Sequence, residues 1–368
     1  MNKTETVTID KHADPSAVPS VMQAAVYKGR DRVELCEVPV PGIGEGEILV
    51  RVGACGVCAT DIKKIELGLV PPPRIFGHEI AGTVVRAGRK VTKFEPGARV
   101  VVHHHVPCRC CFYCRRKLYS QCDIYRRTGT TAGFEPAGGG FAEYVRVMDW
   151  IVEAGTVEIP DGISFEEASF LEPLNTCLKA LETAELAPGE VVLVVGQGPI
   201  GLLLTQAARH NGCTVVGLDL MESRLRVARE LGANFALNPG KESVEGILAG
   251  ITEGRGADLA IVATAVPDVV VMAQKQVRRG GRVLLFAQTV PEEIIPIDAS
   301  RICMEEKKLV GSYSSSVELQ EEAARLIFGR RVNVSRLITH RLPLARLLDG
   351  IHIASHPSED SLKVVINP

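Results

Sequence analysis

The chain of 368 residues contains no apolar run close to the roughly eighteen residues that a membrane-spanning helix needs. Its first twenty residues are polar and lack an apolar core of the length found in signal peptides. The formal charge is -2, and the basic residues are dispersed rather than gathered into a patch that would attract nucleic acid or an anionic membrane. These absences predict a cytoplasmic protein with neither nucleic acid nor a membrane as a partner, and a flexible N-terminal extension over residues 1–20.

The hydrophobic pattern changes near residue 175. Earlier segments are short, rich in β-branched residues and interrupted by Gly and Pro, which indicates an antiparallel, barrel-like β domain. Later segments alternate strands with helices, which predicts an α/β domain with a parallel sheet covered by helices. The basic segment 278–282 is interpreted as a solvated turn. The expected strands after residue 175 are 191–195, 214–219, 259–263, 282–287 and 363–366, and the expected helices are 199–211, 222–231, 266–277 and 318–328.

Four cysteines stand at a Cys-x2-Cys-x2-Cys-x7-Cys spacing, namely Cys108, Cys111, Cys114 and Cys122. The short gaps let successive thiolates curl around one ion at a Zn–S distance of about 2.3 Å, and the longer gap lets the chain loop back with a fourth ligand. Cys110 is left over. A disulfide cluster is the alternative, but the absence of a secretory signal favours a reducing compartment. The spacing therefore predicts a closed structural zinc site with no position for substrate.

A glycine-rich turn opens the second domain, where the apolar run VVLVV is followed by Gly196-x-Gly198-x-x-Gly201. With Pro199 and Ile200 it begins a helix whose free N–H groups suit a pyrophosphate. The next strand ends at Asp219, whose carboxylate would accept both ribose hydroxyls and repel a 2′-phosphate, which favours NAD over NADP. Two alternatives stay open. Asp219 could be an ordinary solvated strand end, and Arg224 could be either a ribose or phosphate contact or a plain surface charge.

A second set of metal-type residues is dispersed along the first domain and includes Cys58, His78, Glu79 and Glu172. A catalytic zinc takes three protein ligands from separate elements and keeps one open position, and such a set can supply them. Singly, each residue has an ordinary interpretation as a core or surface side chain.

These motifs, in this order, resemble those of the zinc-dependent medium-chain alcohol dehydrogenases, from about residue 22 to the end. The tripeptide Glu172-Pro173-Leu174 is similar to the sorbitol and polyol dehydrogenase branch. The resemblance implies a chaperonin-10-like β barrel plus a Rossmann domain, with the active site between them. It divides the chain into a catalytic domain (21–174, with a zinc lobe at about 103–123), an NAD-binding domain (175–311) and a return to the catalytic domain (312–368).

By resemblance, Cys58, His78 and Glu172 bind the catalytic zinc, so the chain carries two zinc ions. Glu79 lies close to that metal, and Asp61 holds a ligand in place by a hydrogen bond. Thr60 relays the proton of the substrate hydroxyl, although a Thr beside an Asp is otherwise a common turn pair. The expected reaction is hydride transfer from an alcohol to NAD, with zinc acting as a Lewis acid.

The sequence departs from the family pattern at three positions. Lys63 replaces a histidine that continues the proton relay in many members, and Ala59 replaces an arginine that faces the pyrophosphate. Ser312 and Tyr313 stand where the sorbitol branch has Arg-Tyr, which weakens the case for sorbitol itself. A polar pocket still favours a polyol, sugar alcohol or cyclitol.

Three other functions stay open. A threonine-type amino alcohol is the second substrate class. A zinc-free reductase of quinones or enoyl groups is the alternative from the same superfamily, and a nonenzymatic NAD-responsive zinc-binding protein is the alternative from another class. Relatives lead us to expect a homo-oligomer, dimer or tetramer. His103, His104 and His105 are expected to continue a strand, and packing or hydrogen bonding is favoured over metal binding for them.

Overall fold

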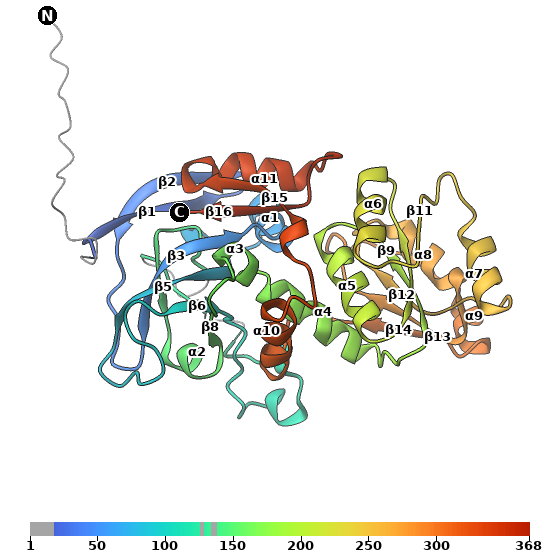
Figure 1. Cartoon of the computed structure of the whole chain (residues 1–368), viewed down its shortest axis with the longest axis horizontal. Helices are drawn as coiled ribbons and strands as arrows, with labels where there is room; N and C mark the ends of the chain where they lie inside the picture. Colours follow the sequence, from blue (N-terminus) through green and yellow to red (C-terminus); the bar gives the residue numbers. More distant parts are fainter. Residues whose placement is uncertain (1–17, 126–128, 134–137) are drawn as a thin grey trace, which may run out of the picture.

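The computed structural model describes residues 18–125, 129–133 and 138–368. Two lobes lie side by side, and helix α4 (Leu171–Thr183) runs between them (Figure 1). The C-terminus lies in the first lobe, next to strands that come early in the sequence. Within the described ranges, no helix has the length and apolar character needed to cross a membrane.

The first lobe is built from two sheets, and the last strands of the chain pair inside it. Strand β16 (Lys363–Asn367) runs antiparallel to β3 (Ile48–Gly56), with Val365 opposite Gly56. The smaller sheet has the order β2 (Arg32–Pro39), β1 (Val21–Gly29) and β4 (Arg74–Ile75). The larger sheet has the order β15 (Ile338–Pro343), β16 (Lys363–Asn367), β3 (Ile48–Gly56), β5 (Glu79–Ala87), β6 (Arg99–Val102) and β8 (Thr156–Glu158), with β7 (Tyr144–Val147) also on β3.

Short helices connect and cover these strands. Helix α3 begins with a capping box in which Ser164 and Glu167 satisfy each other's free backbone N–H groups. The helices of this lobe are α1 (Ala59–Glu66), α2 (Asp149–Ala154), α3 (Phe165–Ala168), α10 (Gln320–Phe328) and α11 (Leu347–Ser355), with 3-10 turns at Cys114–Arg116, Tyr119–Gln121, Val317–Leu319, Ser335–Leu337 and Leu344–Arg346.

The second lobe is a parallel sheet, as the alternating pattern predicts, and the α/β class is confirmed. Its order is β11 (Phe235–Leu237), β10 (Thr214–Leu218), β9 (Val191–Val195), β12 (Ala257–Val262), β13 (Val277–Leu285) and β14 (Lys308–Gly311). The helices are α5 (Pro199–His210), α6 (Glu222–Glu230), α7 (Val244–Thr252), α8 (Pro267–Gln276) and α9 (Ala299–Met304).

Strand β9 shows why helices cover both faces of this sheet. Successive side chains of a strand point to opposite faces, so a fully apolar strand needs a partner on each side. Val192 and Val194 join the core under α4 and α5, whereas Leu193 and Val195 join the core under α7 and α8. The carboxyl end of β9 is therefore held rigidly at the point where the glycine-rich turn begins.

The segment 278–282 is not the solvated turn that its composition indicates. It lies inside β13, where a bulge separates Val277, opposite Ala257, from Arg282, opposite Leu259. Arg282 is buried, forms an ion pair with Glu190 and donates hydrogen bonds to the carbonyl of Ala184 at 2.9 Å. A carboxylate partner and backbone acceptors make burial of this guanidinium possible.

Candidate active site and zinc lobe

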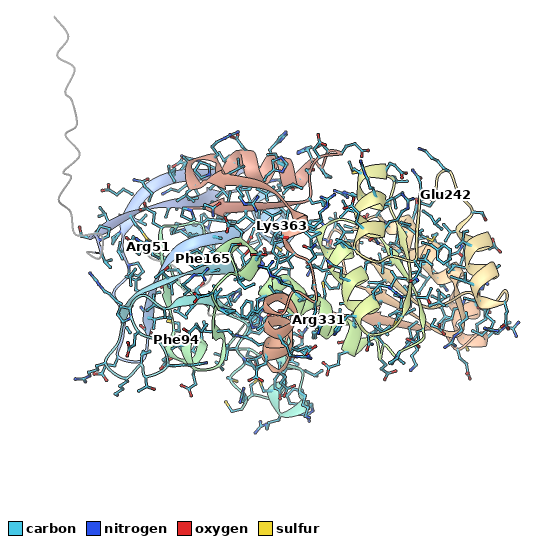
Figure 2. All side chains as sticks on the ribbon, viewed as in Figure 1. Arg51, Phe94, Phe165, Glu242, Arg331 and Lys363 are labelled. Carbon is cyan, nitrogen blue, oxygen red and sulfur yellow. The ribbon has the colours of Figure 1, made fainter. Side chains whose placement is uncertain are left out.

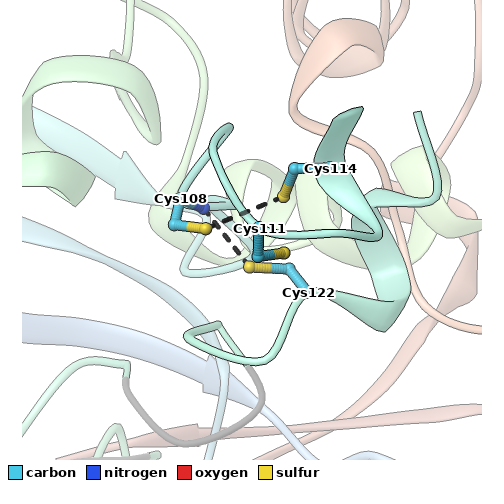
Figure 3. Close-up of side chains that lie close together, drawn as sticks. All are labelled: Cys108, Cys111, Cys114 and Cys122. Carbon is cyan, nitrogen blue, oxygen red and sulfur yellow. Dashed lines mark hydrogen bonds between the residues drawn. The ribbon is translucent and has the colours of Figure 1, made fainter. Parts of the chain in front are cut away.

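The four cysteines of the zinc lobe converge in space. The sulfur atoms of Cys108, Cys111, Cys114 and Cys122 all lie within 4.8 Å of one another (Figure 3). Burial raises the pKa of Cys108, but hydrogen bonds from the backbone N–H groups of Cys110 and Cys111 outweigh it and bring this pKa to about 6. A thiol that loses its proton near neutral pH is ready to bind zinc.

The fifth cysteine of the lobe, Cys110, stays at the edge of this cluster. Its side chain is exposed, and its sulfur is 3.6 Å from that of Cys108. It is not a member of the four-sulfur group.

Three of the dispersed metal-type residues also meet. Ligand atoms of Cys58, His78 and Glu79 lie within 4.8 Å of one another, although 19 residues separate Cys58 from His78 in the sequence. Cys58 caps the start of α1, and Glu79 is the first residue of β5. Glu79 fits because the opposing residue is Gly56, where an added Cβ would lie 1.8 Å from the Glu79 carboxylate.

His78 is oriented by Asp61, as the resemblance implies for a residue behind a metal ligand. Its Nδ1 lies 3.1 Å from Asp61 Oδ1, and this leaves Nε2 for a ligand. Burial lowers the pKa of His78, but the Asp61 carboxylate and the Cys58 thiol outweigh it and raise that pKa well above its ordinary value. The other oxygen of Asp61 is buried without a hydrogen-bond partner among the described residues.

Glu79 is paired from behind by a residue that sequence reasoning missed. Lys363 of β16, labelled in Figure 2, places its ammonium 2.5 Å from Glu79 Oε2 and donates to the carbonyl of Val57 at 2.9 Å. The two side chains are only 7% and 1% exposed. A single lysine within the otherwise apolar run of the last strand was the signal available in the sequence.

Glu172 lies close to this group but outside it. Its Oε1 is 3.5 Å from His105 Nδ1, and it sits in the first turn of α4, at the junction of the two lobes. Burial raises the pKa of Glu172 to about 7, with His78 opposing and Glu79 adding to this effect. A buried carboxylate that resists ionisation is a group whose charge a nearby cation would stabilise.

Thr60 is on the first turn of α1, half-buried and two residues from Cys58. Lys63 of the same helix donates to the carbonyl of Gln288 in the second lobe, and so reaches across the space between the lobes. Burial lowers the pKa of Lys63.

The three consecutive histidines do not continue a strand, because β6 ends at Val102. Instead their rings pack together, with 4.1 Å between the centroids of His104 and His105 and 5.1 Å between those of His103 and His105. His104 also approaches His78, at 5.8 Å between ring centroids. All three therefore belong to the surroundings of the candidate metal site, and His103 and His105 are hydrogen bonded.

The glycine-rich turn has the geometry that a pyrophosphate site needs. Gly196 has a φ of 93°, in the left-handed region that favours glycine, and Gly198 caps the start of α5 with Pro199 and Ile200 following. An added Cβ at Gly201 would lie 1.8 Å from the carbonyl oxygen of Gly196, so the helix can pack this closely against the strand only with glycine there.

Asp219 and Arg224 lie next to this turn. Asp219 accepts hydrogen bonds from the backbone N–H groups of Gln197 at 2.7 Å and Met221 at 2.9 Å. Arg224 Nη1 is 3.6 Å from Asp219 Oδ2 and 3.7 Å from the position of a Cβ on Gly198. The carboxylate thus faces the turn, which makes it more than a solvated strand end.

A cleft of about 960 Å³ opens between the lobes. Its walls include Ser312, Tyr313 and Ser315 after β14, Lys179 of α4 and Tyr119 of the zinc lobe. Tyr313 is 41% exposed, and its carbonyl accepts a hydrogen bond from Lys179 at 2.7 Å. The Ser312 hydroxyl is buried without a partner among the described residues.

Both metal-type groups fit zinc by the chemistry of their donors. The lobe offers four sulfur ligands in a closed set, which is typical of structural zinc. The other group offers sulfur, imidazole and carboxylate donors next to an unsatisfied buried Asp61 oxygen, which is typical of a catalytic site. The fold and these two sites define a two-domain, zinc-binding, nicotinamide-dependent dehydrogenase.

Comparison with known proteins agrees with this class. Residues 44–161 match the family described as "Alcohol dehydrogenase GroES-like domain", and residues 199–329 match that described as "Zinc-binding dehydrogenase". The chain belongs to the zinc-dependent medium-chain alcohol dehydrogenases, and the barrel plus Rossmann architecture that the resemblance implies is confirmed.

Two relatives and one solved structure illustrate the range of the family. Sorbitol dehydrogenase of Bacillus subtilis is 30% identical over 95% of this chain and 98% of its own length. L-threonine 3-dehydrogenase of Symbiobacterium thermophilum is 31% identical over 91% of this chain and 94% of its own length. A structure described as a zinc-binding dehydrogenase of Sinorhizobium meliloti, bound to NADP, has a TM-score of 0.85 and 30% identity, and covers 95% of this chain and 100% of that chain.

Proposed function

We propose that this dehydrogenase oxidises a secondary alcohol group of a polyol, sugar alcohol or cyclitol, with NAD as the hydride acceptor. The observation that carries the proposal is the meeting of Cys58, His78 and Glu79 within 4.8 Å of one another, with the buried Glu172 close to His78 and Glu79. Zinc in such a site supplies Lewis acidity to an alcohol oxygen, and the nicotinamide accepts the hydride.

We further propose that Cys58, His78 and Glu172 hold this zinc, with Glu79 held back by Lys363, and that a second zinc occupies the four-cysteine lobe. Asp61 keeps His78 in the orientation for binding. Thr60 takes the proton of the substrate hydroxyl, because a hydroxyl can accept one proton while it donates another.

The cofactor-binding residues of the proposal are Gly196, Gly198, Pro199, Ile200, Gly201, Asp219 and Arg224. The Asp219 carboxylate lies against the turn that would hold the pyrophosphate, which supports hydrogen bonding to ribose hydroxyls and disfavours a 2′-phosphate there. The relative solved with NADP shows why this choice needs measurement.

The polar groups next to the candidate metal site favour a polyol. Burial lowers the pKa values of His104 and His105 well below their ordinary range, so both are neutral, and the Ser315 hydroxyl contacts His105. Neutral donors and acceptors suit hydroxyl groups, and a site that hydrogen-bonds a hydroxyl strongly rejects analogues that lack it.

A threonine-type amino alcohol is the second candidate. Glu182, Glu293 and Glu318 line the cleft, and a carboxylate is what an ammonium group would need. The threonine dehydrogenase among the relatives supports keeping this substrate in the test.

NADH formation with a panel of polyols, L-threonine and simple primary and secondary alcohols tests the proposal. We expect the highest kcat/KM with a substrate that carries neighbouring hydroxyls, and a preference for simple primary alcohols would contradict the polyol assignment. Cys58→Ser should abolish turnover while NADH binding persists, whereas the control Cys36→Ser, on strand β2, should keep full activity. Turnover without zinc would favour the zinc-free reductase, and absence of turnover with every alcohol would favour the nonenzymatic zinc-binding protein.

The assembly and location of the protein are also proposals. All eleven cysteines are unpaired, which is typical of a reducing compartment, so we propose a cytoplasmic enzyme. Strand β14 is the edge of the parallel sheet, and Val290 and Ile294 nearby are 57% and 89% exposed. An unpaired strand edge and exposed apolar side chains support a dimer or tetramer, which light scattering during size-exclusion chromatography would test.

A further inference from the structure

A chain of hydrogen bonds runs from the carbonyl of Gly155, at the end of α2, toward the candidate metal site. Gln320 of α10 donates through its amide nitrogen to the carbonyl of Gly155 at 2.7 Å, and its amide oxygen lies 2.7 Å from His103 Nδ1. His103 Nε2 lies 2.6 Å from the hydroxyl of Ser315, and the same hydroxyl contacts His105 Nδ1. Gln320, His103 and Ser315 are all buried.

The direction of every bond in this chain follows from its first member. A carbonyl oxygen only accepts, so Gly155 fixes which end of the Gln320 amide is the nitrogen. The amide oxygen then accepts from His103 Nδ1, which must carry the proton. Burial lowers the pKa of His103 to about 4, so the ring is neutral and its Nε2 is an acceptor.

The remaining two bonds transmit this orientation to His105. Ser315 must donate its only proton to His103 Nε2, so its oxygen can only accept from His105 Nδ1. The Glu172 carboxylate is 3.5 Å from the same nitrogen, at the outer limit of a hydrogen bond, so Ser315 is the principal acceptor for His105 Nδ1. A neutral His105 with its proton on Nδ1 has a lone pair on Nε2, and none of the described residues hydrogen-bonds to that atom.

We propose that Gln320, His103 and Ser315 are positioning residues that hold His105 as its Nδ1–H tautomer, so that Nε2 accepts a hydrogen bond from a second hydroxyl of the substrate. The hydroxyl donor in this statement rests on the proposed function. The location supports it, because His105 adjoins Glu172, where the reacting alcohol group is expected, and Ser315 forms part of the cleft wall. An acceptor at this point distinguishes a diol from an alcohol that has one hydroxyl.

The tautomer can be measured without substrate on the zinc-loaded protein. Two-bond proton–nitrogen NMR correlations of protein labelled with 15N-histidine separate the two tautomers, and the spectrum of His105→Phe identifies the His105 signals. We expect Nδ1–H in the wild type, and appearance of Nε2–H in Ser315→Ala and in Gln320→Leu. Ser314→Ala is the matched control, since the Ser314 hydroxyl pairs with Tyr125 rather than with a histidine.

The kinetic readout uses the same variants. Loss of a fixed acceptor should reduce kcat/KM for the best polyol about tenfold in Ser315→Ala, with less than a twofold change for a secondary alcohol that has one hydroxyl. Ser314→Ala should change neither value. Equal losses on both substrates would overturn the hydroxyl-acceptor role.

The two proposals fail separately. An Nε2–H tautomer in the wild type, or an unchanged tautomer in Ser315→Ala, would overturn the proposal that the hydrogen-bond chain fixes the tautomer of His105, even if polyols are substrates. If the protein oxidises no polyol, the proposed function fails, and the hydroxyl-acceptor role fails with it. In that case the tautomer of His105 still tests whether the hydrogen-bond chain positions this ring. If Gln320→Leu does not fold, Ser315→Ala alone provides this test.

Discussion

The buried ion pair between Lys363 and Glu79 makes a quantitative prediction about stability. The Lys363 ammonium is 2.5 Å from the carboxylate, and neither side chain is more than 7% exposed. Burial lowers the pKa of Lys363, but Glu79 outweighs it and raises that pKa, so the lysine remains charged at neutral pH. Lys363→Met would leave the Glu79 charge buried without a cation, which costs about 3–5 kcal/mol in the free energy of unfolding.

Urea unfolding followed by tryptophan fluorescence measures this loss. The only tryptophan, Trp150, is in α2 of the same lobe, so its signal reports on the domain that contains the pair. The double variant Lys363→Met/Glu79→Gln removes both charges and should recover most of the stability, because a neutral pair needs no cation. The control Lys90→Met, in the same lobe, removes a lysine that is 72% exposed beside Glu45, and should cost about 1 kcal/mol or less.

The reasoning is refuted if Lys363→Met costs no more than Lys90→Met, or if the double variant is no more stable than Lys363→Met alone. Zinc content is measured in each variant, so that loss of metal is separated from loss of the ion pair.

Three further predictions concern the sites. Cys111→Ser should lose about one zinc ion per chain and solubility, whereas Cys110→Ser should keep both, and elemental analysis showing equal zinc in the two proteins would contradict the four-sulfur site. Asp219→Ser should lower the ratio of kcat/KM for NAD to that for NADP by about tenfold or more, and an unchanged ratio would mean that Asp219 does not face the ribose. Burial raises the pKa of Glu172 from its ordinary value near 4.5 to about 7, so the folded zinc-free protein retains a proton that the unfolded chain loses. Its stability should therefore fall by roughly 3 kcal/mol as the pH rises from 4.5 to 7, and urea titrations should show this slope disappearing in Glu172→Gln.

The zinc lobe and the cofactor turn could be predicted because their constraints are local. Four cysteines within fifteen residues are near enough in the chain to meet at one point, and the structure places their sulfur atoms within 4.8 Å of one another. The glycine pattern likewise follows from requirements within one turn, because Gly196 has a positive φ and a Cβ on Gly201 would collide with the carbonyl oxygen of Gly196. The alternation of strands and helices after residue 175 predicted the parallel sheet for the same reason.

Residues that depend on partners far away in the sequence could not be predicted. Lys363 and Glu79 are 284 residues apart, and Gln320 and His103 are 217 apart, so only the folding of the last strands and α10 onto the first domain brings them together. Arg282 was misinterpreted as part of a solvated turn, because its composition resembles a surface loop while its partner Glu190 lies 92 residues earlier.

The sequence by itself therefore determined the α/β class, the four-cysteine cluster and the glycine-rich turn, since each is set by spacing within a short segment. Tertiary structure alone decided that Lys363 lies behind Glu79 and that a buried chain of hydrogen bonds reaches His105. Charged and polar groups are stable in the interior only where a complementary charge or hydrogen-bond partner is present. That complement comes from another part of the chain, and the fold decides where the two meet.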